Sequence, residues 1–124
     1  MADLIELKTN TDNRGDLTVL EKEIDFPIKR VFYIKNVPEN IERGGHRHKK
    51  TKMALICLNG SCKVFCNNGI EKKEYLLDNS NKCLILQTRD WHTMHAFSTK
   101  DTILLCLASE PYDKNDYIDE KYPN

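Results

Sequence analysis

The sequence lacks the features that mark membrane, secreted or nucleic-acid-binding proteins. No apolar run approaches the roughly 20 residues of a membrane-spanning helix. The first six residues carry acids where a secretory signal is basic and then apolar. Nineteen basic and 19 acidic side chains cancel, so no global field favours nucleic acid or an acidic membrane. We therefore expect a cytoplasmic protein that binds neither nucleic acid nor membrane.

Paired cysteine motifs and nucleotide-cofactor motifs are also missing. The five cysteines are an odd number, form no CxxC pair and fall mostly inside apolar runs: Cys57, Cys62, Cys66, Cys83 and Cys106. A disulfide framework or a zinc site has closer, paired spacings, so we interpret these residues as small buried hydrophobes. The chain has no Gly-rich dinucleotide fingerprint and no phosphate loop, so neither motif signals a cofactor.

Short apolar or alternating runs organise the chain. No long segment keeps a 3.6-residue apolar repeat, and turn signals such as Asn59-Gly60 separate the runs. The pattern predicts strands over residues 4–7, 17–21, 29–34, 53–58, 62–66, 72–77, 83–86, 92–97 and 102–108. We predict an all-β sandwich or barrel forming one domain over residues 1–124. Its polar tail, from about residue 110, is predicted as a short helix or an extended arm.

The stretch over residues 43–52 combines two histidines with a cluster of positive charge. His46 and His48 are two residues apart, so in a strand both imidazoles project from the same face. The stretch also holds five Lys or Arg residues and no carboxylate. Paired imidazoles in positive surroundings suit proton transfer on a small anionic substrate, or a metal ion.

The ordered motifs of the chain resemble those of the dTDP-4-keto-6-deoxyglucose 3,4-ketoisomerases of deoxyamino-sugar biosynthesis, which are small cupins. The matching motifs are KRVFYI at 29–34, RGxHxHK at 43–49, CLNGSCKV at 57–64, WHxMHxFS at 91–98, LAS at 107–109 and YDxxDYI at 112–118. The HxH motif alone is weak, but the ordered set is specific. The resemblance implies a cupin-type β-barrel or jelly roll and a dTDP-linked 4-keto-6-deoxy sugar as substrate.

One departure from the general cupin pattern bears on metal binding. Metal-binding cupins carry a carboxylate four or five residues after the second histidine of the first motif, where this chain has Lys52 and Met53. An ammonium group at or beside a ligand position raises the electrostatic cost of holding a cation. We therefore predict no metal, and the basic residues become candidates for a diphosphate cradle.

The keto shift defines what the catalytic side chains must do. A base removes the C3 proton of the sugar, an enediolate is stabilised, and an acid returns a proton at C4. Imidazole, with a pKa of about 6.5, can accept and donate near neutral pH. We predict His46 and His48 as the catalytic pair, with His46 the base by carry-over from the family motif, and Tyr33 as a donor to the sugar. The alternative is that both histidines are structural. Substrate and product are isomers, so we predict no cofactor.

Other candidates would bind the substrate. Arg14, Arg43, Lys49 and Lys52 are candidates for diphosphate or sugar contacts. His92 and His95 are three residues apart, so a regular strand sends them to opposite faces, and the second cupin motif favours His92 in the cavity. Trp91 is expected either to cover the nucleobase or to pack in the core.

The pair Arg14-Gly15 lies where the family divides by product stereochemistry. The Arg-Gly branch resembles the enzymes that yield the galacto-configured 3-keto sugar, whereas the sister branch carries bulkier residues there. The resemblance therefore implies a galacto product. It also implies a homodimer, with exchange of an N-terminal strand such as residues 4–7.

Two other functions remain open from the sequence. A related dTDP-sugar epimerase would use similar His and Tyr chemistry but invert a carbon. A non-catalytic or metal-binding cupin would only sense a sugar nucleotide or another small anion.

Overall fold

The computed structural model describes residues 1–123, and it confirms the predicted all-β class. The strands, in chain order, are β1 (Asp3–Glu6), β2 (Thr9–Asp12), β3 (Gly15–Thr18), β4 (Arg30–Ile34), β5 (Arg43–His48), β6 (Met53–Asn59), β7 (Cys62–Asn67), β8 (Lys72–Leu77), β9 (Lys82–Leu86), β10 (Trp91–His95), β11 (Ile103–Ala108) and β12 (Tyr117–Ile118). The helix η1 (Lys114–Asp116) is a single 3-10 turn. No helix of this described part is long and apolar enough to cross a membrane.

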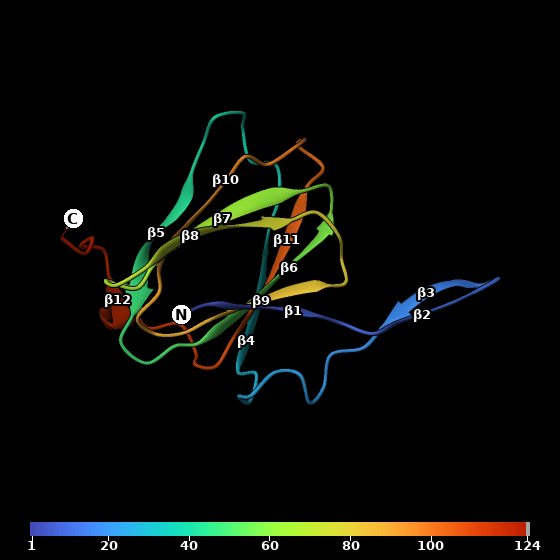
Figure 1. The fold of residues 1–124 in the computed structure, drawn as a ribbon, viewed down its shortest axis with the longest axis horizontal. Coiled ribbons are helices and arrows are strands. Elements are labelled where there is room, and N and C mark those ends of the chain that lie inside the picture. Colours follow the sequence, from blue (N-terminus) through green and yellow to red (C-terminus); the bar gives the residue numbers. More distant parts are fainter. Residues whose placement is uncertain (124) are drawn as a thin grey trace.

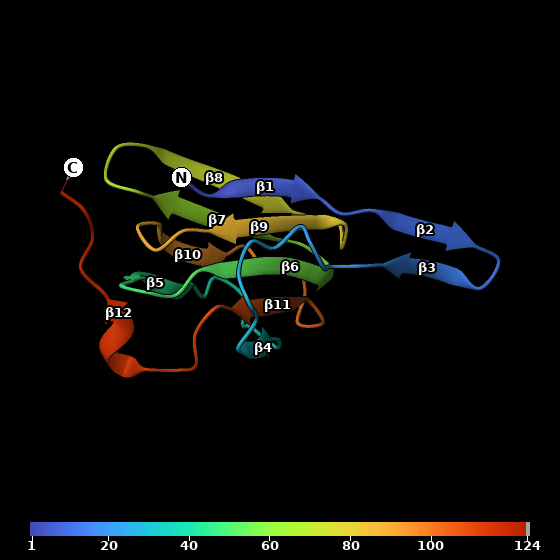
Figure 2. The same cartoon turned by 90° about the horizontal axis from the view of Figure 1, so that it is seen from below.

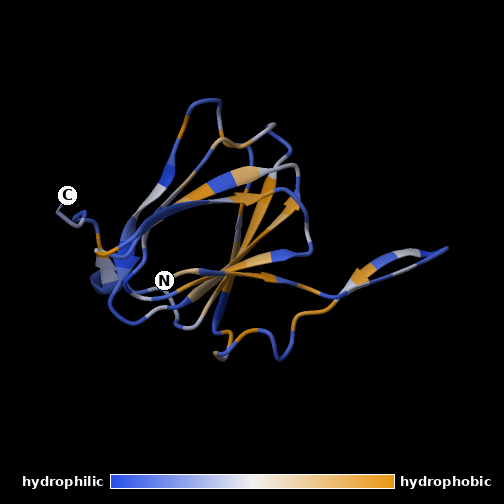
Figure 3. Ribbon diagram, viewed as in Figure 1, coloured by the Kyte–Doolittle hydropathy of each residue, from blue (hydrophilic) through white to orange (hydrophobic). Residues whose placement is uncertain are grey.

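Two five-stranded antiparallel sheets face each other (Figure 1). One sheet has the order β1-β9-β6-β11-β4 and the other the order β12-β5-β10-β7-β8. Apolar residues from both inner faces form the main core; examples are Leu55, Leu104, Val64 and Met94. The strands facing this core are the hydrophobic ones in Figure 3, and the connecting loops are mostly hydrophilic. Residue alternation along each strand thus determines which side chains enter the space between the sheets.

A second apolar cluster covers the outer face of the first sheet. Leu20, Ile24 and Phe26, from the loop before β4, pack with outward-facing residues such as Ile56 and Leu107. This loop covers the outer face of the first sheet. The central strands of that sheet are therefore continuous apolar runs in the sequence, as expected for strands covered on both faces.

The strands β2 and β3 form a separate hairpin that extends away from the two sheets (Figures 1 and 2). Its strands pair from Thr9 and Thr18 to Asp12 and Gly15, around a turn at Asn13-Arg14. Leu17 on the hairpin is 62% exposed. An isolated two-stranded hairpin is at best marginally stable in water.

The polar tail forms both a short helix and an extended segment, the two alternatives that the sequence left open. Asp113 caps η1 by accepting a hydrogen bond from the Asn115 backbone N–H at 3.0 Å. The chain then pairs with β5 as β12, where Tyr117 lies opposite His48. The tail therefore reaches the same strand end as the HxH motif.

Candidate active site

A β-bulge in β5 aligns the histidines of two neighbouring strands. His46 pairs with His92, but the register then shifts, so that Thr93 pairs with Gly44 and Met94 with Arg43. Gly44 and Gly45 both have φ of +83°, a region that side chains with a Cβ rarely adopt. A Cβ on Gly44 would also lie 2.9 Å from the His92 carbonyl oxygen. The two glycines therefore permit the bulge that sets the register of His46 and His92.

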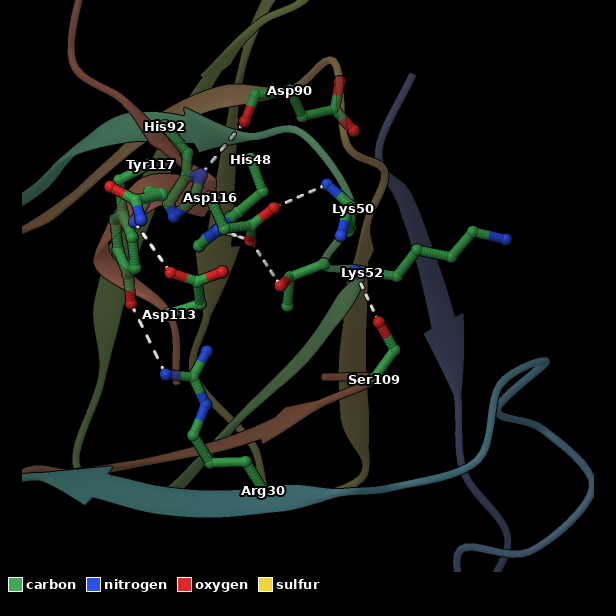
Figure 4. Close-up of polar contacts among 12 residues, drawn as sticks. Arg30, His48, Lys50, Lys52, Asp90, His92, Ser109, Asp113, Asp116 and Tyr117 are labelled. Atoms are coloured by element: carbon green, nitrogen blue, oxygen red, sulfur yellow. Dashed lines mark hydrogen bonds and ion pairs between the residues drawn. The ribbon is translucent and has the colours of Figure 1, made fainter. Parts of the chain in front are cut away.

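Three imidazoles gather between the sheets, beside the tail. The ring centroids of His46 and His48 are 5.0 Å apart, those of His46 and His92 5.0 Å, and those of His48 and His92 6.2 Å. The Tyr117 ring is 4.6 Å from both His46 and His48. Figure 4 shows His48, His92 and Tyr117 directed toward the same space. His46 is partly exposed, whereas His48 and His92 are buried.

In each of the two buried histidines, one ring nitrogen forms a hydrogen bond and the other has no partner in the described chain. His48 Nδ1 lies 2.9 Å from Asp116 Oδ2, and His92 Nδ1 lies 3.0 Å from the Asp90 carbonyl oxygen. The Nε2 atoms of both are buried without a hydrogen-bond partner in the described chain. A buried polar atom without a partner is costly in a native protein, so it often marks a place for a ligand or water. The two Nε2 atoms are thus candidates to contact substrate.

Burial keeps these imidazoles neutral near pH 7. Desolvation lowers the pKa of His46 to about 4 and that of His92 to about 3. Desolvation also lowers the pKa of His48, although the hydrogen bond and charge of Asp116 oppose this shift. Neutral imidazoles have a lone pair available, as a general base requires.

Arg30 brings positive charge to the histidine cluster from the opposite sheet. It lies on the inner face of β4, and its Nη1 is 3.5 Å from the Tyr117 hydroxyl. Its charge lowers the pKa of both His46 and His48. Its Nε is buried without a partner in the part of the chain that the structure describes. A cation with unused donors is suited to bind an oxyanion.

The structure does not bring Tyr33 to the histidines. Along β4, Arg30, Phe32 and Ile34 alternate with the more exposed Val31 and Tyr33. Tyr33 therefore lies on the outer face of its sheet and is 64% exposed. The sequence predicted that the Tyr33 hydroxyl donates to the sugar. The tyrosine that lies beside the histidines is instead Tyr117.

Arg14 and Gly15 are remote from the histidines within one chain. They lie at the tip of the hairpin, whereas β5 and β12 lie at the other end of the molecule in both views (Figures 1 and 2). Arg14 is exposed and forms an ion pair with Asp12 at 2.7 Å.

Three other predicted residues line a groove of about 550 Å³: Arg43, Trp91 and His95. Trp91 is buried and donates from Nε1 to the Asp119 carbonyl oxygen at 3.1 Å. His95 Nε2 pairs with Glu74 at 2.9 Å. His92 faces inward and His95 outward, the arrangement that a three-residue spacing produces in a strand. We place the chemistry at the histidine cluster rather than in this groove, because the ring nitrogens of His48 and His92 that can contact substrate lie in the cluster.

The two predicted lysines lie just beyond the HxH motif. Lys49 follows β5 and is exposed. Lys52 precedes β6, and its ammonium lies 3.9 Å from an Asp25 carboxylate oxygen. Neither makes a contact with the three histidines that would assign it a role.

Sequence reasoning missed Arg30, Asp116 and Tyr117 as functional residues. Each lies within a motif that carried the family resemblance, KRVFYI or YDxxDYI, but no local spacing links it to His48. Among residues 1–123, no group of three or more His, Cys, Asp or Glu side chains is arranged to hold a metal ion. Independence from metal stays a prediction.

A histidine cluster inside a small double sheet defines the class of the protein as a cupin-type enzyme. Residues 1–123 match the family described as FdtA: WxcM-like, C-terminal. The chain is 42% identical, over 98% of its length and 87% of the relative, to a TDP-4-oxo-6-deoxy-alpha-D-glucose-3,4-oxoisomerase of Aneurinibacillus thermoaerophilus.

Solved structures agree with this relationship. A 3,4-ketoisomerase from Helicobacter canadensis superposes with a TM-score of 0.91 at 36% identity, covering 96% of this chain and 90% of that one. A mutant of the 3,4-ketoisomerase QdtA from Thermoanaerobacterium thermosaccharolyticum, in complex with TDP-4-keto-6-deoxyglucose, gives 0.90 at 40% identity, with coverage of 96% and 87%. The chain belongs to the FdtA family of sugar 3,4-ketoisomerases, and the protein is an isomerase.

Proposed function

We propose that the protein converts TDP-4-keto-6-deoxy-D-glucose into TDP-3-keto-6-deoxy-D-hexose by histidine acid–base catalysis. The observation that carries this proposal is the pair of buried Nε2 atoms of His48 and His92, which have no hydrogen-bond partner among residues 1–123 and lie beside Arg30 and Tyr117. The substrate follows from the relatives, one acting by name on TDP-4-oxo-6-deoxyglucose and another solved with TDP-4-keto-6-deoxyglucose.

The proposed reaction needs only proton transfers. A neutral imidazole of the pair His46 and His48 takes the C3 proton, and the electron pair moves to form an enediolate across C3 and C4. Return of a proton to C4, with transfer of a proton from the C3 oxygen to the C4 oxygen, completes the isomerisation. No electron leaves the sugar, so no redox cofactor is required.

Arg30 and Tyr117 supply the electrostatic part of the proposal. A guanidinium group close to the sugar oxygens stabilises the negative charge of the enediolate more than that of the neutral ketone. The Tyr117 hydroxyl, already within 3.5 Å of Arg30, can donate to the same oxygen. We propose that the exposed basic residues Arg43 and Lys49, together with Lys52, bind the diphosphate of the substrate. Each carries a positive charge that can pair with a phosphate oxygen.

We propose a homodimer in which the hairpin completes the partner's site. Leu17 is exposed on a hairpin that extends away from the two sheets, and Arg14 and Gly15 lie at its tip, remote from the histidines. Contact with a second copy would cover the hairpin and bring Arg14 to a histidine cluster. The strand β1, which the sequence suggested for exchange, pairs here with β9 of the same chain. Sedimentation as a monomer at micromolar concentration would count against the dimer.

We propose the galacto configuration for the product and the cytoplasm as the place of action. The configuration rests on Arg14-Gly15 and on family resemblance. The compartment is supported by five free, buried cysteines, which suit a reducing environment.

One NMR experiment tests substrate, reaction and configuration together. The protein is mixed with TDP-4-keto-6-deoxyglucose in D₂O, and deuterium incorporation and product identity are followed. We expect deuterium at the reacting carbons and a 3-keto product with an axial C4 hydroxyl. Inversion of a carbon without a carbonyl shift would indicate an epimerase, and an equatorial hydroxyl would overturn the galacto assignment. No turnover would overturn the proposed function.

A further inference from the structure

The carboxylate of Asp116 joins the 3-10 turn to His48. Asp116 Oδ2 lies 2.9 Å from His48 Nδ1, and the two side chains are only 7% and 4% exposed. The partners are 68 residues apart in the sequence, and both are held by the pairing of β12 with β5. The contact is thus a buried, fixed part of the fold.

Two further donors determine the protonation of this contact. The Lys50 backbone N–H donates to Asp116 Oδ1 at 2.7 Å, and the Thr51 hydroxyl donates to Oδ2 at 2.5 Å (Figure 4). Burial alone would raise the pKa of Asp116, but these donors and His48 together lower it, so the carboxylate is ionised and can only accept. His48 must therefore carry its proton on Nδ1. The lone pair of the neutral ring is then on Nε2, the buried atom that has no partner in the described chain.

The other two histidines lack this arrangement. His92 Nδ1 bonds to a neutral carbonyl oxygen, and the low pKa of about 3 makes that ring a weak base. The Gly44 backbone and the charge of Asp119 raise the pKa of His46 less than burial lowers it, and Asp119 acts on the ring only through space. An ionised partner gains interaction energy when its histidine becomes charged, whereas a carbonyl gains less. Of the three rings, His48 is the one whose protonated form is best supported.

We propose that Asp116 is a positioning residue that holds His48 as the Nδ1–H tautomer, so that His48 Nε2 removes the sugar proton. This inference rests on the proposed ketoisomerase function and assigns the base within its catalytic pair. The charged and titratable groups facing His48 are Arg30 from β4, His46 from β5, His92 from β10, Asp116 from η1 and Tyr117 from β12.

The substitution Asp116→Asn reverses the tautomer without changing the shape of the side chain. Because the Lys50 N–H can only donate, it selects the amide oxygen of the new Asn at the Oδ1 position. The amide NH₂ then occupies the Oδ2 position and donates to His48 Nδ1, which places the ring proton on Nε2. The base is thereby lost. An Asp→Asn change of this kind lowers kcat by about 10⁴ in a serine protease, and we expect a loss of roughly 10²–10⁴ here.

The test compares Asp116→Asn with a matched control in the same turn. Asp113→Asn alters the exposed cap of η1, which bonds to the Asn115 N–H and not to a histidine. Nitrogen-15 NMR of the histidine rings gives the tautomers without substrate, and steady-state kinetics gives kcat and KM. We expect the Nδ1–H form of His48 in the wild type and in Asp113→Asn, and the Nε2–H form in Asp116→Asn, with KM changed less than about threefold.

A second variant keeps the test decisive if Asp116→Asn folds poorly. Asp116→Glu retains an ionised acceptor, so it should keep the Nδ1–H tautomer and recover at least tenfold of the lost kcat. An Nε2–H tautomer in the wild type, or a kcat of Asp116→Asn within threefold of wild type, overturns the inference. Failure of the wild type to isomerise TDP-4-keto-6-deoxyglucose overturns the proposed function instead, since the NMR measurement is made without substrate.

Discussion

The two glycines of β5 allow a prediction in which one substitution controls for the other. Gly44 and Gly45 share a φ of +83°, so an alanine at either position adopts an unfavourable backbone conformation. This strain costs roughly 1–2 kcal/mol. At Gly45 the added methyl group meets nothing within 4 Å, whereas at Gly44 it lies 2.9 Å from the His92 carbonyl oxygen and 3.3 Å from the Thr93 Cα. Backbone atoms cannot rotate away, so β10 must shift.

The expected difference between the variants isolates this shift. Gly45→Ala should lose only the strain of about 1–2 kcal/mol in the free energy of unfolding. Gly44→Ala should lose a further 1–3 kcal/mol, roughly the cost of overpacking. A displacement of His92 by a few tenths of an ångström should lower kcat by roughly 3- to 30-fold, since about 1 Å of misplacement can cost 10²-fold. Gly45→Ala should keep kcat within about threefold.

Urea denaturation and steady-state kinetics of the two variants measure these values. Equal losses of stability and activity in Gly44→Ala and Gly45→Ala would refute the reasoning, because then the contact with the His92 carbonyl would contribute nothing. Unchanged stability in both would show that the positive φ values are not required.

Four further predictions concern the site. His46→Asn should bind TDP with near wild-type affinity by calorimetry yet lose roughly 10²–10⁴ in kcat; wild-type turnover would remove His46 from the catalytic pair. Arg30→Gln should lose roughly 10- to 100-fold in kcat, as expected for a charge-assisted hydrogen bond, and Arg30→Lys less; the kinetics of the pair measure this. Since the pKa of His92 falls to about 3 on folding, the unfolded chain binds more protons below about pH 6.5, so stability is full above that pH and falls toward pH 3. Urea denaturation across this range should show a loss on the order of 4 kcal/mol that His92→Asn reduces; an unchanged slope would contradict the assignment. Incubation with EDTA should leave activity unchanged, and metal analysis should find no stoichiometric ion; loss of activity that metal restores would overturn the prediction.

Strand periodicity predicted most of the fold, because burial between two sheets imposes it directly on the sequence. It missed β2, whose residues Thr9–Asp12 are all polar and have no apolar alternation, and it predicted no strand at the positions of β5 and β12. It also placed the third strand at residues 17–21 instead of Gly15–Thr18, since the apolar residues there belong partly to the following loop. Strand β10 ends at His95 and not at residue 97, where Ala96 turns to a positive φ of 53°. Local pattern thus fails where a strand is exposed or where the backbone turns.

The site was less predictable than the fold, because it depends on which strand ends meet. The two-residue spacing placed His46 and His48 on one face, and the two preceding glycines were the available signal for the bulge that pairs His46 with His92. The contact of His48 with Asp116 has no comparable signal, since it joins two segments through the pairing of β12 with β5. Side chains alternate between the two faces of β4, so either Phe32 or Tyr33 had to face inward. Both are aromatic, and the sequence therefore did not show which of them does.

One positive charge affects both sides of the proposed proton transfer. Before substrate binds, burial lowers the pKa of His46 and of His48 and the charge of Arg30 adds to this shift, so both rings are free bases. After transfer, the same charge stabilises the enediolate but destabilises the new imidazolium. The transfer is therefore favoured at the ring that has a fixed negative partner of its own. Asp116 gives His48 that partner through a hydrogen bond, whereas His46 has only a charge acting through space, so the abstracted proton is best accommodated on His48.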